Sequence, residues 1–168
     1  MRIEAGAPIV IVQPGTVYGA NDHSGIGQQL KAAYDGTARY ISFGSTGISV
    51  THVDDIAAGI VAAFDRGSIG EAYILTGTNI RLGEGMRVAA RAAGRKPPRF
   101  AIPNAVLRLG SRLSPNGGAL LGVPPNLREI VSSADGVTYW GSNAKAVAEL
   151  GFAPRPFEVG VRDAFGNG

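Results

Sequence analysis

The sequence predicts an α/β fold in which parallel strands are covered by helices. The first indication is residues 9–12, Ile-Val-Ile-Val, an apolar run without the alternation of a half-exposed strand. Such a run is typical of a strand with both sheet faces covered, as in parallel sheets. The second indication is that candidate strands at 48–53 and 72–76 alternate with segments of helical periodicity.

Size and composition place the chain among single globular domains. It has 168 residues, 45% of them hydrophobic, which is ample for one core. The absence of cysteine excludes disulfides, thiol catalysis and Cys-based metal sites. His23 and His52 show no metal-ligand spacing, so no metal is predicted. No apolar run approaches the roughly 18 residues of a membrane span, and the N-terminus lacks signal-peptide features, so we expect a cytoplasmic protein without membrane association.

The basic residues are mostly arginine and cluster in one part of the chain. The net charge is +3, and seven arginines lie within 81–112, where Glu84 is the only acid. Arg87, Arg91 and Arg95 are four apart and would share one helix face. A solvated face is favoured over a phosphate or nucleic-acid patch, because no aromatic residues interleave with the arginines as in single-strand binders.

Residues 9–19, IVIVQPGTVYG, are the stretch around which the fold is organised. They predict a buried strand ending in a Pro14-Gly15 turn. Ligands of open α/β sheets bind beyond the carboxyl ends of strands, so the backbone after this strand is the first candidate site. An ordinary core strand with a Pro-Gly turn is the alternative. Nothing upstream could supply a parallel neighbour, so either the strand pairs with later segments or the sequence starts partway through a larger fold.

Two strands and two helices are expected next. Residues 25–36 have helical spacing of apolar residues, and Gly36 provides a stop. Strands are expected at 39–43 and 48–53 with a GSTG turn between them. Asp54 is then expected to cap a helix that ends at Gly67, with Asp55 favouring its positive end. Acid/base work by this pair is the less favoured alternative, because adjacent carboxylates at a helix start seldom converge.

The second half of the chain is expected to be mainly helical. The predicted segments are a strand at 72–76, helices at 82–93, from Pro103, from Pro124, from Ser142 to Gly151 and from Pro156, and an extended piece at 137–140. The Pro- and Gly-punctuated stretch 97–125 predicts a mobile lobe against the front half.

Three blocks together carry a resemblance to a known family. QPGTVYGAND, VTHVDDIAAGIVAAFDRGSIGEAYILTG and TYWGSNAKAVAELGFAPRPFEVGVRDAF resemble, in order and spacing, the back half of extended short-chain dehydrogenases/reductases. The likeness is to the NAD-dependent epimerase/dehydratase and dihydroflavonol-reductase-like branch. It covers nearly the whole chain.

The resemblance implies a fold and a domain organisation. The chain would be one truncated domain, the C-terminal part of an NAD(P)-binding Rossmann-like fold without the N-terminal dinucleotide-binding strands. Residues 1–96 would hold the remaining Rossmann-like strands and helices, and residues 97–168 a mostly helical substrate-binding lobe.

The resemblance also implies site residues. Pro14, Gly15, Thr16 and Val17 would contact the nicotinamide end of NAD or NADP. Tyr18, Asn21 and His52 would border the pocket of a small-molecule substrate.

Two parts of the family's machinery have no counterpart in this sequence. No G-x-G-x-x-G turn follows a strand, so the pyrophosphate has no helix N-terminus to bind. None of the five tyrosines is followed four residues later by lysine, so the Tyr-x-x-x-Lys pair that transfers the proton is missing and no catalytic residue is assigned. Ile48 occupies the place where nucleotide-sugar epimerases often carry an arginine for the diphosphate, which favours a less charged carbonyl substrate.

The leading hypothesis is the substrate-binding portion of an NAD(P)-dependent oxidoreductase or epimerase acting on a carbonyl or hydroxyl group, inactive alone. The alternative is a non-catalytic binding or scaffolding module derived from that family, possibly a homo-oligomer that covers an open sheet edge. A hydrolase or lyase is disfavoured because no G-x-S-x-G elbow is present.

Overall fold

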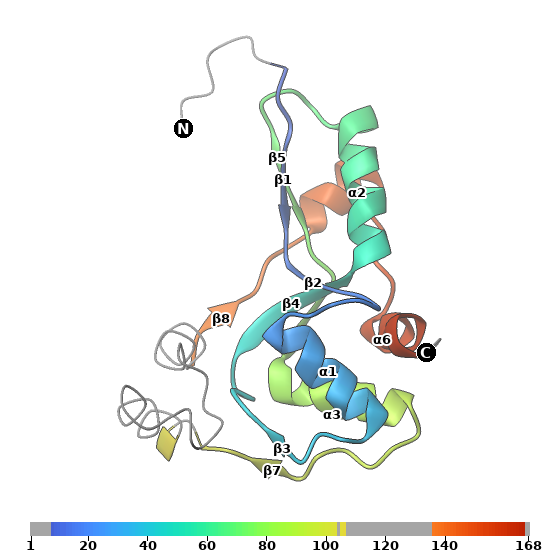
Figure 1. Ribbon diagram of the computed structural model, residues 1–168. Coiled ribbons are helices and arrows are strands. Elements are labelled where there is room, and N and C mark those ends of the chain that lie inside the picture. The colour runs from blue at the N-terminus through green and yellow to red at the C-terminus, as the bar shows by residue number, and fades with distance from the viewer. Residues whose placement is uncertain (1–7, 104, 107–135, 167–168) are drawn as a thin grey trace.

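A computed structural model describes residues 8–103, 105–106 and 136–166 of the chain. The described strands form three small sheets and the helices pack around them (Figure 1). Strand β1 (Ile11–Pro14) pairs in parallel with β5 (Ala72–Leu75). Strand β4 (Gly47–His52) is the centre of the largest sheet. It pairs in parallel with β2 (Thr16–Tyr18) and β8 (Thr138–Tyr139), and antiparallel with β6 (Thr78–Arg81).

Two glycines carry the chain from the β1–β5 sheet onto β4. Gly15 separates β1 from β2, and Gly77 separates β5 from β6. A Cβ on Gly15 would lie 2.6 Å from the backbone oxygen of Ser49, and one on Gly77 would lie 2.5 Å from that of Val50. Only glycine therefore allows both crossings to pass so close to the backbone of β4.

The larger apolar core, called the β4 core here, lies between the β4 sheet and three helices. These are α1 (Gly25–Asp35), α3 (Leu82–Ala92) and α6 (Phe157–Phe165). Helix α1 begins where the Ser24 hydroxyl accepts the N–H of Gly27 at 3.1 Å and ends at Gly36, whose φ is 75°. The buried residues of the β4 core are Tyr18, Leu30, Ala33, Ile41, Phe43, Ile48, Val50, Leu82, Met86, Ala89, Phe157, Val161, Ala164 and Phe165.

The smaller apolar core, called the β1 core, lies on one face of the β1–β5 sheet. Helix α2 (Val53–Arg66) and the π-helical turn η2 (Ala146–Leu150) cover that face, and Gly151 with φ 67° ends η2. Figure 1 shows α2 running alongside β1 and β5. The buried residues of the β1 core are Ile56, Ala62, Ala63, Tyr73, Leu75, Ala146, Leu150 and Phe152.

Most element positions expected from the sequence agree with the structure. The helices ending at Gly36 and Gly151 and the one following Pro156 are present. A short pair, β3 (Tyr40–Ile41) with β7 (Phe100–Ala101), replaces the longer strand expected at 39–43. Strand pairing at this point spans only two residues of each strand.

Three local expectations were wrong. Residues 9–12 are half-buried, because among the described residues β1 has only one partner strand and helices on one face. Pro14-Gly15 does not end the strand in a loop, since the chain continues directly as β2. Asp54 does not cap α2. His52 is the N-cap residue, and its Nδ1 accepts the N–H of Asp54 at 3.3 Å.

The proposed boundary at residue 96 stays a prediction. The helices expected from Pro103 and Pro124 fall mostly or wholly outside the described residues, as does most of the 97–125 lobe. The described part of the second half includes α6, which packs into the β4 core together with α1 and α3.

Candidate functional site

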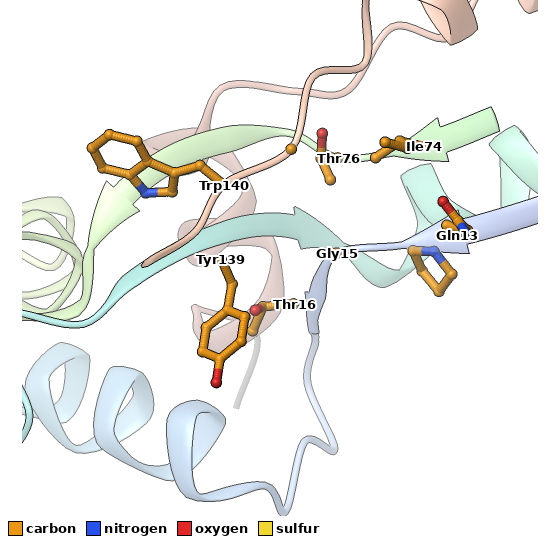
Figure 2. A pocket seen from close by; sticks show the side chains of 9 residues that line it. Gln13, Gly15, Thr16, Ile74, Thr76, Tyr139 and Trp140 are labelled. Carbon is orange, nitrogen blue, oxygen red and sulfur yellow. The ribbon is translucent and has the colours of Figure 1, made fainter. Parts of the chain in front are cut away.

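An open hollow lies where the two parallel strands β1 and β5 reach their carboxyl ends (Figure 2). Its volume is about 380 Å³, at the lower end of the range for small-molecule pockets. Strand β1 runs into it through Pro14 and Gly15, and β5 through Ile74 and Thr76. The residues that line it are Gln13, Pro14, Gly15, Thr16, Ile74, Thr76, Tyr139, Trp140 and Gly141.

The far wall of the hollow is a returning segment, residues 139–143, that hydrogen bonds fix to the sheets. The buried Ser49 hydroxyl donates to Asn79 Oδ1 at 2.5 Å and accepts the N–H of Gly141 at 2.9 Å. Asn79 Nδ2 donates to the carbonyl of Gly141 at 3.1 Å, and Asn143 Nδ2 donates to that of Thr76 at 2.6 Å. These polar groups hold the wall in place against β4, β5 and β6.

Tyr139 and Trp140 bring two exposed aromatic rings to this wall. Their exposed fractions are 56% and 51%. As neighbours on an extended segment they point to opposite sides, which Figure 2 shows. Large planar side chains beside an open hollow provide surface on which a planar ligand could stack.

Thr76 is the buried polar residue of the lining. Its side chain is only 3% exposed, and its hydroxyl has no hydrogen-bond partner among the described residues. Gly141 packs closely against this residue, because a Cβ there would lie 3.2 Å from Thr76 Cγ2 and 3.1 Å from Ile74 Cγ2. A buried hydroxyl without a partner costs free energy, which a ligand or water at the hollow would recover.

The structure brings together three of the four residues assigned to the nicotinamide end. Pro14, Gly15 and Thr16 all line the hollow. Val17 instead packs half-buried against the β1 core.

The three residues assigned to substrate lie elsewhere. Tyr18 and His52 are 1% and 5% exposed, and their rings meet edge-on with centroids 5.6 Å apart. Phe157 packs edge-on against the other side of Tyr18, at 5.3 Å. Asn21 is exposed in the loop before α1. In this structure Tyr18 and His52 serve packing and capping, and their contact with a substrate stays a prediction.

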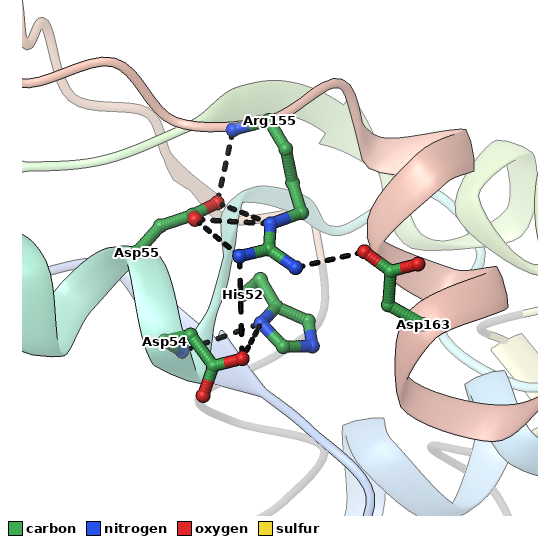
Figure 3. A network of polar contacts seen from close by, with 5 residues as sticks. All are labelled: His52, Asp54, Asp55, Arg155 and Asp163. Atoms are coloured by element: carbon green, nitrogen blue, oxygen red, sulfur yellow. Dashed lines mark hydrogen bonds and ion pairs between the residues drawn. The ribbon is translucent and has the colours of Figure 1, made fainter. Parts of the chain in front are cut away.

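A second polar cluster joins the N-terminus of α2 to α6 (Figure 3). Arg155 Nε donates to both carboxylate oxygens of Asp55 at 3.0 and 3.1 Å, and its backbone N–H donates to Asp55 Oδ2 at 2.9 Å. Arg155 Nη1 also donates to Asp163 Oδ2 at 2.8 Å. The hydrogen bond to Asp55 is the main reason that the pKa of Arg155 is raised. Each of the three guanidinium nitrogens of Arg155 contacts a carboxylate oxygen of Asp55 or Asp163. We therefore interpret the cluster as a structural connection between α2 and α6.

Burial makes Tyr18 a poor acid. Removal from water raises the pKa of the Tyr18 phenol well above its ordinary value, and the nearby Asp55 carboxylate raises it further. At neutral pH this phenol is therefore fully protonated and acts as a neutral packing group.

Sequence reasoning missed Thr76, Trp140 and Gly141 as site residues. The available signal was that Thr76 directly follows a parallel strand, as Gly15 follows another, so both belong to the same sheet edge. Nothing local in the sequence places the 139–143 segment beside them.

Within the described residues, no group of three or more His, Asp or Glu side chains is arranged to hold a metal ion. None of the helices described there is both long and apolar enough to cross a membrane.

Comparison with solved structures shows which fold the chain has. The protein gox2253 is 34% identical with a TM-score of 0.75, and the match covers 98% of this chain and 50% of that one. A nucleoside-diphosphate-sugar epimerase from Pseudomonas aeruginosa is 26% identical with a TM-score of 0.68, over 96% of this chain and 48% of that one. The chain has the fold of the NAD-dependent epimerase/dehydratase family. The resemblance and the Rossmann-like fold class predicted from the sequence are thereby confirmed.

A more distant epimerase has been solved with its ligands. UDP-glucuronic acid 4-epimerase from Bacillus cereus, in complex with NAD and a fluorinated UDP-glucuronic acid, is 18% identical with a TM-score of 0.63. That match covers 95% of this chain and 44% of the enzyme. The chain thus spans about half the length of these solved structures. No model of a protein family matches it, and neither does any curated protein.

Proposed function

We propose that the chain forms the part of an NAD(P)-dependent oxidoreductase or epimerase that borders the nicotinamide end of the cofactor and holds a carbonyl or hydroxyl substrate. The observation that carries this proposal is the hollow at the carboxyl ends of β1 and β5, lined by Pro14, Gly15 and Thr16. Adjacent parallel strands end there, which is where α/β sheets bind ligands.

The residues present fit one end of a dinucleotide. Thr76 lines the hollow and its hydroxyl lacks a partner among the described residues, so a carboxamide-bearing ring that reached this hydroxyl would find a hydrogen-bonding group there. When bound, a nicotinamide would give or accept the hydride. The sequence holds no Gly-rich turn for the pyrophosphate, so on this proposal the remainder of the cofactor is held by residues outside this chain.

The substrate class is proposed to be weakly charged. The nearest candidate for a diphosphate-binding position is Ile48, which is 2% exposed at the centre of the β4 sheet and carries no charge. A diphosphate next to this strand would lack a cation from it. Tyr18, Asn21 and His52 remain the proposed border of the substrate pocket.

Trp140 offers a direct binding test, because it lines the hollow and is the only tryptophan. We expect nicotinamide mononucleotide and NADH to change its emission saturably, whereas AMP, which lacks the nicotinamide ring, should leave the emission unchanged. Equal responses to AMP and nicotinamide mononucleotide, or no saturable response to either, would overturn the proposed nicotinamide contact.

A matched pair of variants locates that contact. Thr76→Val keeps the shape of the side chain and removes the unpartnered hydroxyl, so we expect nicotinamide mononucleotide to bind roughly 3- to 10-fold more weakly. Thr138→Val makes the same change in β8, outside the lining of the hollow, and serves as the control. Equal losses in both variants would contradict the role given to Thr76.

The isolated chain is proposed to be inactive. No Tyr-x-x-x-Lys pair is available for proton transfer, so NADH and NADPH should not be oxidised with any member of a carbonyl panel. Measurable turnover by the pure chain would overturn this part of the proposal. The alternative, a non-catalytic binding or scaffolding module that forms a homo-oligomer, predicts self-association. A monomer at all concentrations in sedimentation would count against it.

A further inference from the structure

Three hydrogen bonds behind the wall of the hollow form a closed cycle, called the Ser49 cycle here. The Ser49 hydroxyl donates to Asn79 Oδ1 at 2.5 Å, Asn79 Nδ2 donates to the Gly141 carbonyl at 3.1 Å, and the Gly141 N–H donates back to Ser49 Oγ at 2.9 Å. Each of the three residues thus donates one hydrogen bond and accepts one. Hydrogen bonds that follow one another in the same sense polarise each other, so the cycle acts as a unit.

The groups in the cycle determine its direction. A backbone N–H only donates and a carbonyl only accepts, so Gly141 sets the sense at both of its ends. Turning the Asn79 amide round would place its oxygen against the carbonyl oxygen of Gly141, and two acceptors would then face each other. Ser49 Oγ also lies 3.2 Å from the carbonyl oxygen of Tyr139, but the hydroxyl has one proton and Asn79 is the nearer acceptor. The cycle therefore has a single arrangement.

The Ser49 cycle begins where strand pairing of the wall stops. Strand β8 ends at Tyr139, and its register with β4 covers two residues. Ser49 and Asn79 are direct partners in the β4–β6 register, so their side chains stand next to each other on one face of the sheet. The Ser49 side chain is buried, and removing its hydroxyl would leave the Gly141 N–H without this acceptor. The course of the wall after Tyr139 is thus set by two side chains.

Trp140 lies between the two backbone groups that Ser49 reaches. The Tyr139 carbonyl oxygen and the Gly141 nitrogen, on either side of it, are 3.2 and 2.9 Å from Ser49 Oγ. A Cβ on Gly47 would lie 2.9 Å from Trp140 Nε1, so the indole rests against a position of β4 that has no side chain. About half of the Trp140 surface stays exposed where it lines the hollow (Figure 2). The backbone on both sides therefore locates an indole that remains accessible.

We propose that Ser49 and Asn79 are positioning residues of the candidate site, which hold the Trp140 indole where it borders the planar ring of the ligand. This inference rests on the proposed function, which places a nicotinamide ring in the hollow. Neither side chain is among the described residues that line the hollow, so both act on the ligand through the wall. A wall already held in place has less freedom to lose when a ligand binds, and opening the cycle weakens binding without removing a ligand contact.

Fluorescence of the ligand-free chain tests the positioning of Trp140, the only tryptophan. Ser49→Ala and Asn79→Ala each open the cycle, so the anisotropy of Trp140 emission should fall and its acrylamide quenching constant should rise by about 1.5-fold or more as the wall gains motion. Asn79 is exposed, so Asn79→Ala leaves the core intact even where Ser49→Ala impairs folding.

Thr51→Val provides the matched control. Thr51 lies two residues further along β4 and is buried, but its hydroxyl accepts the N–H of Gly77 at 2.7 Å and belongs to no hydrogen bond of the wall. Its replacement removes a buried hydroxyl from the same strand face and costs stability of the same kind. We therefore expect Thr51→Val to leave the anisotropy and quenching of Trp140 at the values of the natural chain.

A double-mutant cycle tests whether the two side chains act together on the ligand. Each single variant should bind nicotinamide mononucleotide about 3- to 10-fold more weakly. The double variant Ser49→Ala/Asn79→Ala should bind no more weakly than the weaker single variant, because either change opens the same cycle. Independent contributions would instead multiply to a loss of about 10- to 100-fold.

Three results would overturn the proposal. They are Trp140 anisotropy and quenching that Asn79→Ala leaves unchanged, an equal change in Thr51→Val, and affinity losses that multiply in the double variant. Failure of the natural chain to bind nicotinamide mononucleotide would overturn the proposed function instead. The anisotropy of the ligand-free variants would still decide whether Ser49 and Asn79 position Trp140.

Discussion

The two apolar cores of this chain differ in how completely the chain itself covers them. The β4 core has a central strand with partners on both edges and three helices packed on it. The β1 core has a two-stranded sheet, helices over one face, and an apolar stripe of Val53, Ile60, Val61 and Phe64 left exposed on α2. Within the described residues, helices and strands thus cover the β4 core, whereas one side of the β1 region stays exposed.

This difference indicates which region supplies the stability of the isolated chain. Burial of apolar side chains supplies most of the free energy of folding, so the β4 core should dominate the stability of the isolated chain. The open side of the β1 core contributes little until something covers it. The candidate site lies where the two regions meet, at the Gly15 and Gly77 crossings.

The largest expected effect breaks the closed core. Met86→Ala removes a side chain that is 1% exposed between α1, α3 and the β4 sheet, and should lower the free energy of unfolding by about 2 to 5 kcal/mol. Phe64→Ala on the exposed stripe should stay within about 0.5 kcal/mol. Urea denaturation of both variants checks this, and similar losses would mean that the stripe is covered in solution.

The next effect concerns the joint between the regions. Arg155→Met should lower the free energy of unfolding by about 1.5 to 3 kcal/mol, because it leaves the carboxylate of Asp55, 11% exposed, with the backbone N–H of residue 155 but without its guanidinium donors. Lys31→Met removes an exposed i,i+4 pair with Asp35 and should cost less than about 0.5 kcal/mol. Equal, small losses in denaturation experiments would show that the Asp55–Arg155 pair is no stronger than a surface contact.

A smaller effect comes from the cap of α2. His52→Ala should cost about 1 kcal/mol, since the N–H of Asp54 loses its acceptor, whereas His52→Asn supplies another capping oxygen and should recover part of the loss. Thermal or urea unfolding separates the two variants. Equal stability of Ala and Asn at this position would assign the role of His52 wholly to its packing on Tyr18.

The smallest effect at neutral pH concerns ionisation of the Tyr18 phenol. This ionisation changes the free energy of unfolding only at alkaline pH. The folded-state pKa of Tyr18 is raised above 10.0, so the contribution of the neutral phenol is fully present below about pH 10 and is lost as the pH rises above it. Tyr18→Phe cannot ionise and should lose less stability than the natural chain between about pH 10 and 11. Urea unfolding across that interval gives the comparison, and parallel losses would contradict the burial of this group.

Several features were predictable because they depend on neighbouring residues alone. Gly36 and Gly151 end helices at positive φ, as local backbone chemistry predicts. The family followed from three motif blocks in order, and the structural comparison confirmed the fold. Pro14, Gly15 and Thr16 line the hollow at the end of a parallel strand, and their contact with a nicotinamide stays a prediction.

Other features depended on partners distant in the sequence. Asp54 was expected to cap α2, and His52 does so, because packing against Tyr18 fixes the imidazole next to the first turn. The Asp55–Arg155 pair joins residues one hundred positions apart. The hollow needs Trp140 and Gly141, which the Ser49 and Asn79 hydrogen bonds hold in position.

By itself, the sequence determined the alternation of strands and helices, the helix ends and the family whose fold the chain adopts. These follow from side-chain periodicity and from the backbone limits of glycine and proline, which act within a few residues. Only the tertiary structure decided that residues 9–12 are half-buried, that two glycines cross β4, and that the described residues leave one flank of α2 exposed. Burial and hydrogen-bond partners are properties of what packs alongside a residue, and distant segments of the chain supply them.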